Sequence, residues 1–383
     1  MRLTSIRLKN YKAFKDTEVS KLPCFCCWVG ANGTGKTSLF NLFKFLKMAL
    51  TTNVNEAVDE LGGFAEVQSR EAKDPIEIEL CFENMSNSQQ IIYNIEIDVV
   101  DEQVRVLIES ISWRYGKADK MLNCPLVSEG DNIFYDNRGH GRDYIFRTKN
   151  HGFLNLPTVT KIDTYAEMID VYNFLNQTKI FTFDPTCIRE GKEVGNHKTL
   201  ASDGSNLRLV LHHLHKNHPE QFNRILTDLN RAIPGMSIEA KSIEGRVLLR
   251  FHEEAFVDPF LSHYVSDGTL LMLAYLTLIH APNPYSLICI EEPENHLHHA
   301  LLVELAEAFR SYSWNGGQVF ISTHSPEFLN AASIEQVFWL EKEHGYTKMK
   351  RAKDDAQIVS YMADGDKMGW LWKEGLFGKA RTS

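Results

Sequence analysis

Eight residues near the N-terminus have the types and spacing of a phosphate-binding loop. Residues 30–37 read Gly-Ala-Asn-Gly-Thr-Gly-Lys-Thr, which matches G-x-x-x-x-G-K-[ST], and they lie between an apolar segment and a stretch with helical periodicity. Glycines let backbone N–H groups curl around phosphate oxygens, and the start of a helix adds positive potential. A chance glycine-rich turn is the alternative, but it does not explain eight residues in register.

Two side chains of this loop have distinct expected roles. Lys36 would reach the β- and γ-phosphates of a nucleotide, and the Thr37 hydroxyl would coordinate Mg²⁺. ATP and Mg²⁺ are therefore the expected ligands. The candidate nucleotide-binding residues of the loop are Asn32, Gly33, Thr34, Gly35, Lys36, Thr37 and Ser38.

Two adjacent glutamates, Glu291 and Glu292, follow the apolar residues 287–290. A carboxylate pair at the end of a buried strand is costly unless a cation or a proton donor meets it. In phosphate-loop hydrolases a second strand delivers a carboxylate to the Mg²⁺ shell, and Glu291 fits that role. Glu292 points the other way or begins the turn, so it is the candidate general base that polarises water. The alternative is a solvated acidic turn, which the phosphate loop disfavours.

Strands and helices alternate around these motifs, which predicts an α/β fold with a mostly parallel central sheet. Residues 75–149 instead contain alternating apolar segments between polar turns, which predict an antiparallel meander. Residues 3–14 are expected to form an edge strand and a turn, and residues 23–29 a short buried strand. The other expected elements are helices near 38–50, 165–175, 205–233, 268–280 and 299–312, and strands near 285–292, 317–325 and 336–343.

The segment ICIEEPENHLHH, residues 288–299, resembles the Walker B motif and D-loop of ABC-type ATPases of the SMC, RecF and OLD-nuclease group. The version E-E-P-E-N-x-L-H is similar to that of the bacterial AAA_21-type family. Glu291 stands where aspartate is usual, and His299 stands where proline is often found. The resemblance implies an ABC-type P-loop NTPase with a mixed central sheet, an antiparallel β insertion and a helical signature lobe.

The same resemblance implies roles for residues in other segments. Ser266 and Gly268, in YVSDGT, resemble the ABC signature loop and would face a γ-phosphate. His324, which follows VFIST, resembles the switch histidine that senses this phosphate and steers the water. His298 would be a D-loop residue that meets the opposite subunit.

The resemblance also implies roles for two residues near the N-terminus. Gln68 precedes a predicted strand at a spacing similar to that of the Q-loop glutamine, which reaches Mg²⁺ and water. Lys12, in NYKAF, matches a strand turn that lies beside the nucleotide. Histidines 212–218 could suggest a metal site, but a polar helix end is the favoured interpretation because no acid or cysteine joins them.

The motif order predicts a single composite domain. Its expected parts are the phosphate-loop part of lobe I (1–84), the β-meander (85–163), the helical signature lobe (164–280), and the Walker B, switch and tail region (281–383). Segments 203–214 and 235–251 resemble parts of that helical lobe. No heptad run interrupts residues 80–260, so no coiled coil is expected. Too few residues follow His324 for a TOPRIM nuclease domain.

Composition limits the possible partners. The formal net charge of −9 does not favour general nucleic-acid binding, although DNA contact through a local basic patch stays open. The apolar residues 270–279 are about half as long as a membrane span requires. The start lacks the apolar core of a signal peptide, and the seven cysteines are an odd number, so a cytoplasmic protein without a membrane partner is expected.

The signature loop has no use within its own subunit, so the resemblance implies a head-to-tail homodimer that sandwiches ATP. It further implies a switch in bacterial anti-phage defence that controls an effector in trans, a nuclease or a toxin. Two alternatives stay open at this point. One is a RecF-like DNA-repair ATPase that clamps DNA, and the other is a scaffold that binds ATP but scarcely hydrolyses it.

Overall fold

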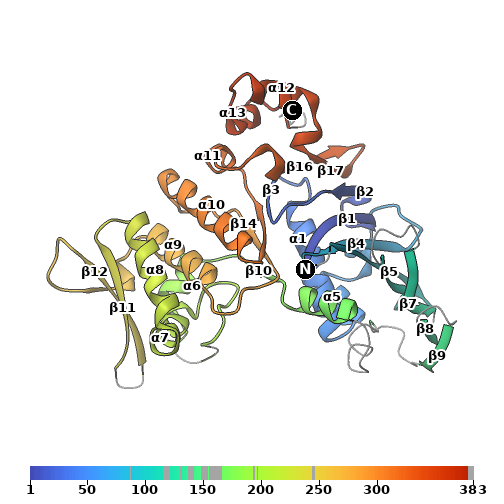
Figure 1. The fold of residues 1–383 in the computed structure, drawn as a ribbon, viewed down its shortest axis with the longest axis horizontal. Coiled ribbons are helices and arrows are strands. Elements are labelled where there is room, and N and C mark those ends of the chain that lie inside the picture. The colour runs from blue at the N-terminus through green and yellow to red at the C-terminus, as the bar shows by residue number, and fades with distance from the viewer. Residues whose placement is uncertain are drawn as a thin grey trace. The chain divides into compact units, whose positions relative to one another are not determined.

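Figure 1 shows the computed structural model of the chain. The structure describes residues 1–86, 88–114, 121–129, 132–136, 142–147, 154, 166–192, 195, 197–243 and 246–377. Two units pack separately: one comprises Met1–Thr178, Ile334–Asp366 and Leu371–Ser383, and the other comprises Lys179–Ser333 and Lys367–Trp370.

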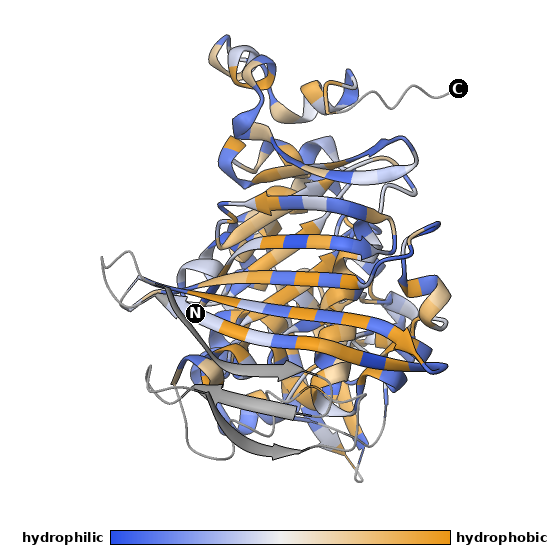
Figure 2. Ribbon diagram, turned by 90° about the vertical axis from the view of Figure 1, so that its right-hand side faces the viewer, coloured by the Kyte–Doolittle hydropathy of each residue, from blue (hydrophilic) through white to orange (hydrophobic). Residues whose placement is uncertain are grey.

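The first unit contains an antiparallel sheet in the order β2-β1-β4-β5-β6-β7-β8-β9. Burial alternates from residue to residue along its strands. In β4, for example, the side chains of Ile76, Ile78, Leu80 and Phe82 are buried. Figure 2 shows this alternation as apolar and polar bands along the strands. The bounds are β1 (Arg2–Tyr11), β2 (Phe14–Ser20), β4 (Ile76–Asn84), β5 (Gln89–Val100), β6 (Gln103–Arg114), β7 (Met121–Glu129), β8 (Asn132–Asp136) and β9 (Arg142–Arg147).

This sheet confirms the antiparallel meander and corrects the prediction for the N-terminal strand. Strand β1 is not an edge strand, because it pairs with β2 on one side and β4 on the other. Ile6 lies opposite Val19 of β2 and opposite Leu80 of β4. The sequence reasoning missed β2, whose segment FKDTEVS contains only two fully apolar residues.

The remaining strands of the first unit are β3 (Phe25–Val29), β16 (Val337–Glu343) and β17 (Tyr346–Arg351). Strand β16 runs parallel to β3 and antiparallel to β17, so this sheet is mixed. All five residues of β3 are buried, as its apolar sequence predicted. The helices are α1 (Lys36–Thr51), α2 (Val54–Asp59), α3 (Phe64–Val67), α5 (Ala166–Asn176) and α12 (Ala356–Ala363), with short turns η2 (Ile334–Gln336) and η3 (Ala352–Asp354).

The second unit contains the parallel strands β10 (Lys179–Phe181), β14 (Leu287–Glu291) and β15 (Gln318–Ser322), with β14 in the middle. Four of the five residues of β14 and all five of β15 are buried. Because parallel strands end at the same edge, the segments that follow β14 and β15 come close together. The helices are α6 (Pro185–Glu190), α7 (Leu207–Asn217), α8 (Pro219–Ala232), α9 (Asp267–Ile279), α10 (His299–Trp314) and α11 (Pro326–Asn330).

The region expected as the helical signature lobe also contains a small antiparallel sheet. Residues 235–251, which resemble a segment of that lobe, form most of the β11–β12 hairpin. The strands are β11 (Met236–Ile243), β12 (Arg246–Glu253) and β13 (Phe260–Leu261), followed by η1 (Ser262–Tyr264). A last helix, α13 (Met368–Lys373), lies near the C-terminus. Within the described part of the chain, no helix has both the length and the apolar character needed to cross a bilayer.

Candidate functional site

The phosphate loop connects β3 to α1 and has the backbone geometry of an anion cradle. Gly33 and Gly35 have φ values of 76° and 101°, in the left-handed region that favours glycine. A Cβ on Gly30 would lie 2.5 Å from Thr34 Oγ1 and 2.8 Å from the Leu340 carbonyl oxygen. Gly35, the N-cap of α1, supplies no side-chain cap to the first helical turn. The backbone N–H groups of that turn are therefore suited to binding phosphate oxygens.

The side chains of the loop fit a bound nucleotide. Lys36 is only 8% exposed, and its Nζ donates to the carbonyl oxygens of Gly30 at 2.7 Å and Ala31 at 3.2 Å. The ammonium group therefore lies directly over the loop. Asn32, Gly33 and Thr37 are exposed, and Ser38 is half-buried. An exposed Thr37 hydroxyl beside a glycine-rich cradle is compatible with Mg²⁺ and a triphosphate.

Thr347 supports the phosphate loop from β17, a role that the sequence reasoning did not find. The Thr347 hydroxyl is fully buried and donates to the Thr34 carbonyl oxygen at 2.7 Å. Its backbone N–H donates to the Ala13 carbonyl oxygen at 2.7 Å. A Cβ on Gly35 would lie 3.3 Å from Thr347 Oγ1 and 3.4 Å from Ala13 Cβ. The loop is thus held between β17 and the turn that follows β1.

The structure brings Lys12 and Gln68 together beside this turn. Lys12 has a φ of 47°, and its N–H donates to the Val67 carbonyl oxygen at 2.7 Å. Gln68 forms a β-bridge with Tyr11, and its Nε2 donates to the Asp74 carbonyl oxygen at 3.1 Å. Burial lowers the pKa of Lys12. The contacts of Lys12 with nucleotide and of Gln68 with metal stay predictions.

In the second unit, the two adjacent glutamates lie at the carboxyl end of β14. Glu291 is the last residue of the strand and lies opposite Ser322 of β15. Glu292 leaves the strand with a φ of 46°, and its N–H donates to the Ser322 carbonyl oxygen at 2.8 Å. A left-handed conformation is costly for a non-glycine residue and often marks a functional turn. Glu292 thus begins the turn, which was one of the two alternatives predicted for it; the other was a strand position that points to the opposite face.

Glu292 lies close to the predicted switch histidine. Strand β15 ends at Ser322, two residues before His324, so this histidine is on the following loop rather than at the strand end. The Oε1 atom of Glu292 is 3.4 Å from His324 Nε2. Asn295 Nδ2 donates to the other carboxylate oxygen at 3.1 Å. An acid–imidazole pair with one orienting amide is an arrangement that can accept and steer a proton.

Glu294 holds the loop that carries His324, and the sequence reasoning gave this acid no role. Its Oε1 accepts hydrogen bonds from the Thr323 hydroxyl at 2.8 Å, the His324 N–H at 2.6 Å and the Ser325 N–H at 3.1 Å. Among the described residues its buried Oε2 has no hydrogen-bond partner. Burial raises the pKa of Glu294 and the Glu292 carboxylate adds to this, although the His324 N–H and the Thr323 hydroxyl oppose it.

The signature loop packs against the same turn. Ser266 is the N-cap of α9, and its hydroxyl accepts from the Thr269 N–H at 3.2 Å. Asp267 pairs with Arg189 and lies 3.8 Å from His296 Nδ1. A Cβ on Gly268 would lie 2.9 Å from the His296 carbonyl oxygen, so this close approach requires glycine.

His298 ends the turn that begins at Glu292. It is the N-cap of α10, and its Nδ1 accepts from the Ala300 N–H at 3.3 Å. The His298 side chain is exposed, and its contact with a second subunit stays a prediction.

Comparisons with known proteins place the chain in a family. Residues 27–330 match the AAA_21 family, described as "AAA domain, putative AbiEii toxin, Type IV TA system". An "ATP/GTP phosphatase" of Helicobacter pylori (strain ATCC 700392 / 26695) is 23% identical over 407 aligned positions, which cover 98% of this chain and 100% of the relative.

Two solved structures of SMC heads resemble the fold. An SMC head bound to the C-terminal winged-helix domain of ScpA has a TM-score of 0.59 at 12% identity, covering 91% of this chain and 97% of that one. An SMC head with an extended coiled coil, bound to the C-terminal domain of ScpA derived from Pyrococcus furiosus, has a TM-score of 0.52 at 11% identity, covering 94% and 99%. These similarities confirm the predicted α/β ABC-type P-loop fold with a mixed sheet.

Proposed function

This chain belongs to the AAA_21 family of ATPases, and from that premise we propose that it binds and hydrolyses ATP as a dimeric switch that controls a partner effector. The observation that carries the hydrolytic part is the 3.4 Å approach of Glu292 Oε1 to His324 Nε2, just beyond the ends of two parallel strands. The Helicobacter pylori relative is named an ATP/GTP phosphatase, which supports the same reaction.

The phosphate loop binds the triphosphate in this proposal. The N–H groups at the start of α1 and the Lys36 ammonium hold the β- and γ-phosphate oxygens. Thr37, Glu291 and Gln68 are the residues that would hold Mg²⁺, which neutralises phosphate charge when bound. Thr347 keeps the loop in its binding conformation through the Thr34 carbonyl oxygen.

Glu292 acts as the general base. Its carboxylate takes a proton from water as the water oxygen bonds to the γ-phosphorus, and the bond to the bridging oxygen of ADP breaks with its electron pair leaving on ADP. Asn295 orients the carboxylate, and His324 lies on the side of Oε1. Glu294 fixes the backbone on which His324 is carried.

Ser266 and Gly268 supply the dimeric part of the proposal. They face the γ-phosphate held by a second, head-to-tail copy, with His298 meeting that copy. ATP then favours the closed dimer because its γ-phosphate makes contacts in that state alone, and hydrolysis releases it. An ATP-driven dimer of this kind controls an effector in trans, a nuclease or a toxin in anti-phage defence. The family description, which names a toxin system, supports this partner class.

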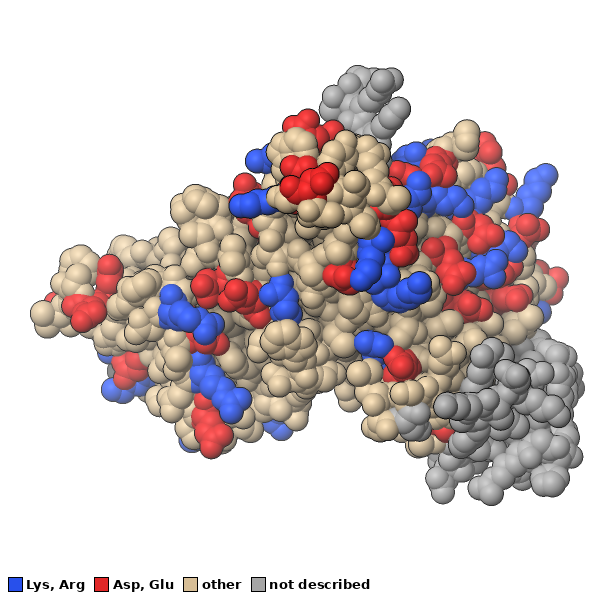
Figure 3. Space-filling view, turned by 45° about the horizontal axis from the view of Figure 1, so that its top comes forward, with Lys and Arg blue, Asp and Glu red and all other residues tan. Residues whose placement is uncertain are grey.

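One face of the described surface gives no support for DNA binding. On the face drawn in Figure 3, the lysine and arginine side chains of the described residues alternate with aspartate and glutamate. Nucleic-acid binding draws most of its affinity from clustered basic side chains. The RecF-like alternative accordingly lacks a supporting basic stripe on this described face.

Two variants test the proposal. Glu292→Gln keeps the side-chain shape but removes the base, so ATP should still bind while turnover falls by about 100-fold or more. Lys36→Ala should abolish ATP binding. The matched controls are Glu307→Gln, an exposed residue of α10, and Lys44→Ala, on the exposed face of α1.

Two readouts separate hydrolysis from switching. Phosphate release measures turnover, and light scattering measures mass with and without ATP. The proposal expects Glu292→Gln to accumulate as an ATP-bound dimer. Unchanged turnover in this variant would refute Glu292 as the base, and a monomer at saturating ATP would refute the dimeric switch while leaving the ATPase intact.

A further inference from the structure

One arginine contacts both residues that flank Ser266 in the predicted signature loop. Arg189 Nη2 donates to the Val265 carbonyl oxygen at 3.1 Å and to Asp267 Oδ1 at 2.5 Å. The Arg189 side chain is only 25% exposed, so water screens these contacts less than it screens a fully exposed ion pair. Ser266 is therefore held on both sides by one guanidinium group.

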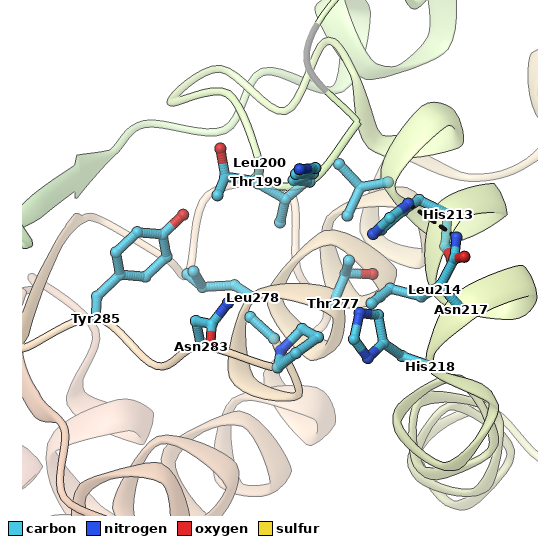
Figure 4. Close-up of a pocket in the computed structure, with 14 residues that line it drawn as sticks. Thr199, Leu200, His213, Leu214, Asn217, His218, Thr277, Leu278, Asn283 and Tyr285 are labelled. Carbon is cyan, nitrogen blue, oxygen red and sulfur yellow. Dashed lines mark hydrogen bonds between the residues drawn. The ribbon is translucent and has the colours of Figure 1, made fainter.

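Helix α9, which begins in this loop, has different surroundings along its length. Residues 269–278 are buried. The last turn of the helix lines a cavity of about 470 Å³, where Thr277 and Leu278 are labelled in Figure 4. At the other end of the helix, Ser266 is exposed. Because apolar packing is not directional, it does not by itself fix the conformation of this exposed loop, and polar contacts must do so.

Arg189 is carried on a short helix whose two ends are held by hydrogen bonds. Helix α6 begins after its N-cap Asp184, whose side chain accepts from the Thr186 N–H at 2.7 Å. At the other end, Arg208 Nη2 donates to the Gly191 carbonyl oxygen at 2.7 Å. These contacts fix the support from which Arg189 reaches the signature loop.

The second carboxylate oxygen of Asp267 faces the turn that carries Glu292. Asp267 Oδ2 lies 3.8 Å from His296 Nδ1, and His296 has a left-handed φ of 65°. A Cβ on Gly268 would lie 2.9 Å from the His296 carbonyl oxygen. Arg189 therefore holds the signature loop at the point where the loop meets this turn.

We propose that Arg189 is a positioning residue that holds Ser266 and Gly268 in the conformation that contacts the γ-phosphate bound by a second copy. The identity of that contact rests on the proposed function, whereas the restraint on the loop rests on the two hydrogen bonds from Nη2. Arg189 acts through the loop and does not bind the phosphates. Its loss should therefore lower turnover and ATP-dependent association without weakening the binding of ATP to the phosphate loop.

Hydrogen–deuterium exchange of the nucleotide-free protein tests the restraint on the loop. Arg189→Met keeps an unbranched apolar side chain and removes the guanidinium. In wild type the Val265 N–H donates to the Ser262 carbonyl oxygen and the Thr269 N–H donates to Ser266 Oγ, both at 3.2 Å. These two amides should exchange at least about tenfold faster in Arg189→Met, because opening of the loop then costs one or more hydrogen bonds less.

The matched control is Arg224→Met, at an exposed arginine of α8. Its signature loop should exchange as that of wild type does. Faster exchange confined to Arg189→Met supports the proposal. Unchanged exchange at Val265 and Thr269, or an equal effect in Arg224→Met, would overturn it.

Steady-state turnover tests the consequence for the reaction. In Arg189→Met, kcat should fall by about 10- to 100-fold while the KM for ATP changes by less than about threefold, because displacement of a positioning group by about 1 Å costs about 100-fold in rate. Arg189→Lys is the rescue variant. Both contacts come from one nitrogen, so an ammonium group can replace part of them and should raise kcat at least about threefold above that of Arg189→Met.

The outcomes separate this proposal from the proposed function. Faster exchange of the loop with wild-type kcat, a raised KM with unchanged kcat, or no rescue in Arg189→Lys would each overturn the assignment of Arg189. A wild-type protein without ATP turnover would instead refute the proposed function. The exchange experiment would then decide by itself whether Arg189 holds the loop.

Discussion

Replacing Glu294 by alanine should slow ATP turnover much more than it weakens ATP binding. One carboxylate oxygen of Glu294 accepts three hydrogen bonds, at 2.6, 2.8 and 3.1 Å, from consecutive residues Thr323 to Ser325. Alanine removes the acceptor and leaves all three donors without it. The His324 imidazole, which lies 3.4 Å from Glu292 Oε1, is carried on this backbone.

The expected magnitude follows from these contacts. Each hydrogen bond to a charged group is worth about 1.5–3 kcal/mol, so losing three of them is sufficient to displace the short loop. A displacement of about 1 Å at a positioning group costs about 100-fold in rate. We therefore expect kcat to fall by about 10- to 100-fold in Glu294→Ala. The KM for ATP should change by less than about threefold, because the phosphate loop rather than this loop binds the phosphates.

Glu294→Gln is the conservative variant that separates positioning from general damage. Its amide oxygen can accept the same three hydrogen bonds, so kcat should stay within about threefold of wild type. Steady-state ATPase assays give kcat and KM, and thermal melts report the stability of each variant. Wild-type turnover in Glu294→Ala, or an equal loss in Glu294→Gln, would refute the assignment of Glu294 as a positioning residue.

The remaining predictions concern the phosphate loop, the signature loop and pH. Thr347→Val should weaken ATP binding by about 3- to 10-fold in a fluorescence titration, since it removes one hydrogen bond to Thr34, while Thr347→Ser should not. Gly268→Ala should lower thermal stability by about 1–3 kcal/mol, because its Cβ would lie 2.9 Å from the His296 carbonyl oxygen. The folded-state pKa of Glu294 is raised from 4.5, so its contribution to stability is lost as pH rises through the folded value. The melting temperature of Glu294→Gln should therefore rise relative to that of wild type as the pH is raised above 4.5, and a pH-independent difference would contradict this.

The phosphate loop, helix α1 and the buried strands could be predicted, because short stretches of sequence determine them. The phosphate loop needs glycines at two left-handed positions, Gly33 and Gly35, and these requirements are visible in the motif itself. Helix α1 buries Leu39, Phe43 and Leu46 at helical spacing, so its periodicity indicated both its existence and its buried face. Strands β14 and β15 could be predicted because each is a short, mostly apolar segment.

Features that depend on distant partners could not be predicted in this way. Thr347 supports the phosphate loop from a strand more than 300 residues away, and an isolated threonine in an alternating strand carries no signal of that contact. Glu294 was visible in the motif, but its three partners lie on a separate loop. The β11 strand did leave a signal: Met236, Ile238 and Ala240 are buried at a period of two, which is typical of a strand.

In the second unit, one short turn joins the predicted signature loop to Glu292, the proposed general base. Residues 292–298 contain two left-handed residues, Glu292 and His296, with φ values of 46° and 65°. Hydrogen bonds from the Asn295 N–H to the Glu292 carbonyl oxygen and from the Leu297 N–H to the Glu294 carbonyl oxygen close this turn on itself, at 3.0 and 3.1 Å.

This closed turn lies between the predicted signature loop and Glu292. Gly268 packs on the His296 carbonyl oxygen at one end of the turn, and the Glu292 carboxylate lies at the other. If the proposed nucleotide contact displaces Gly268, we expect the turn that carries Glu292 to be displaced with it. We therefore expect hydrolysis to depend on engagement of the signature loop, since Gly268, which we propose faces a second copy, packs on the turn that carries the proposed general base.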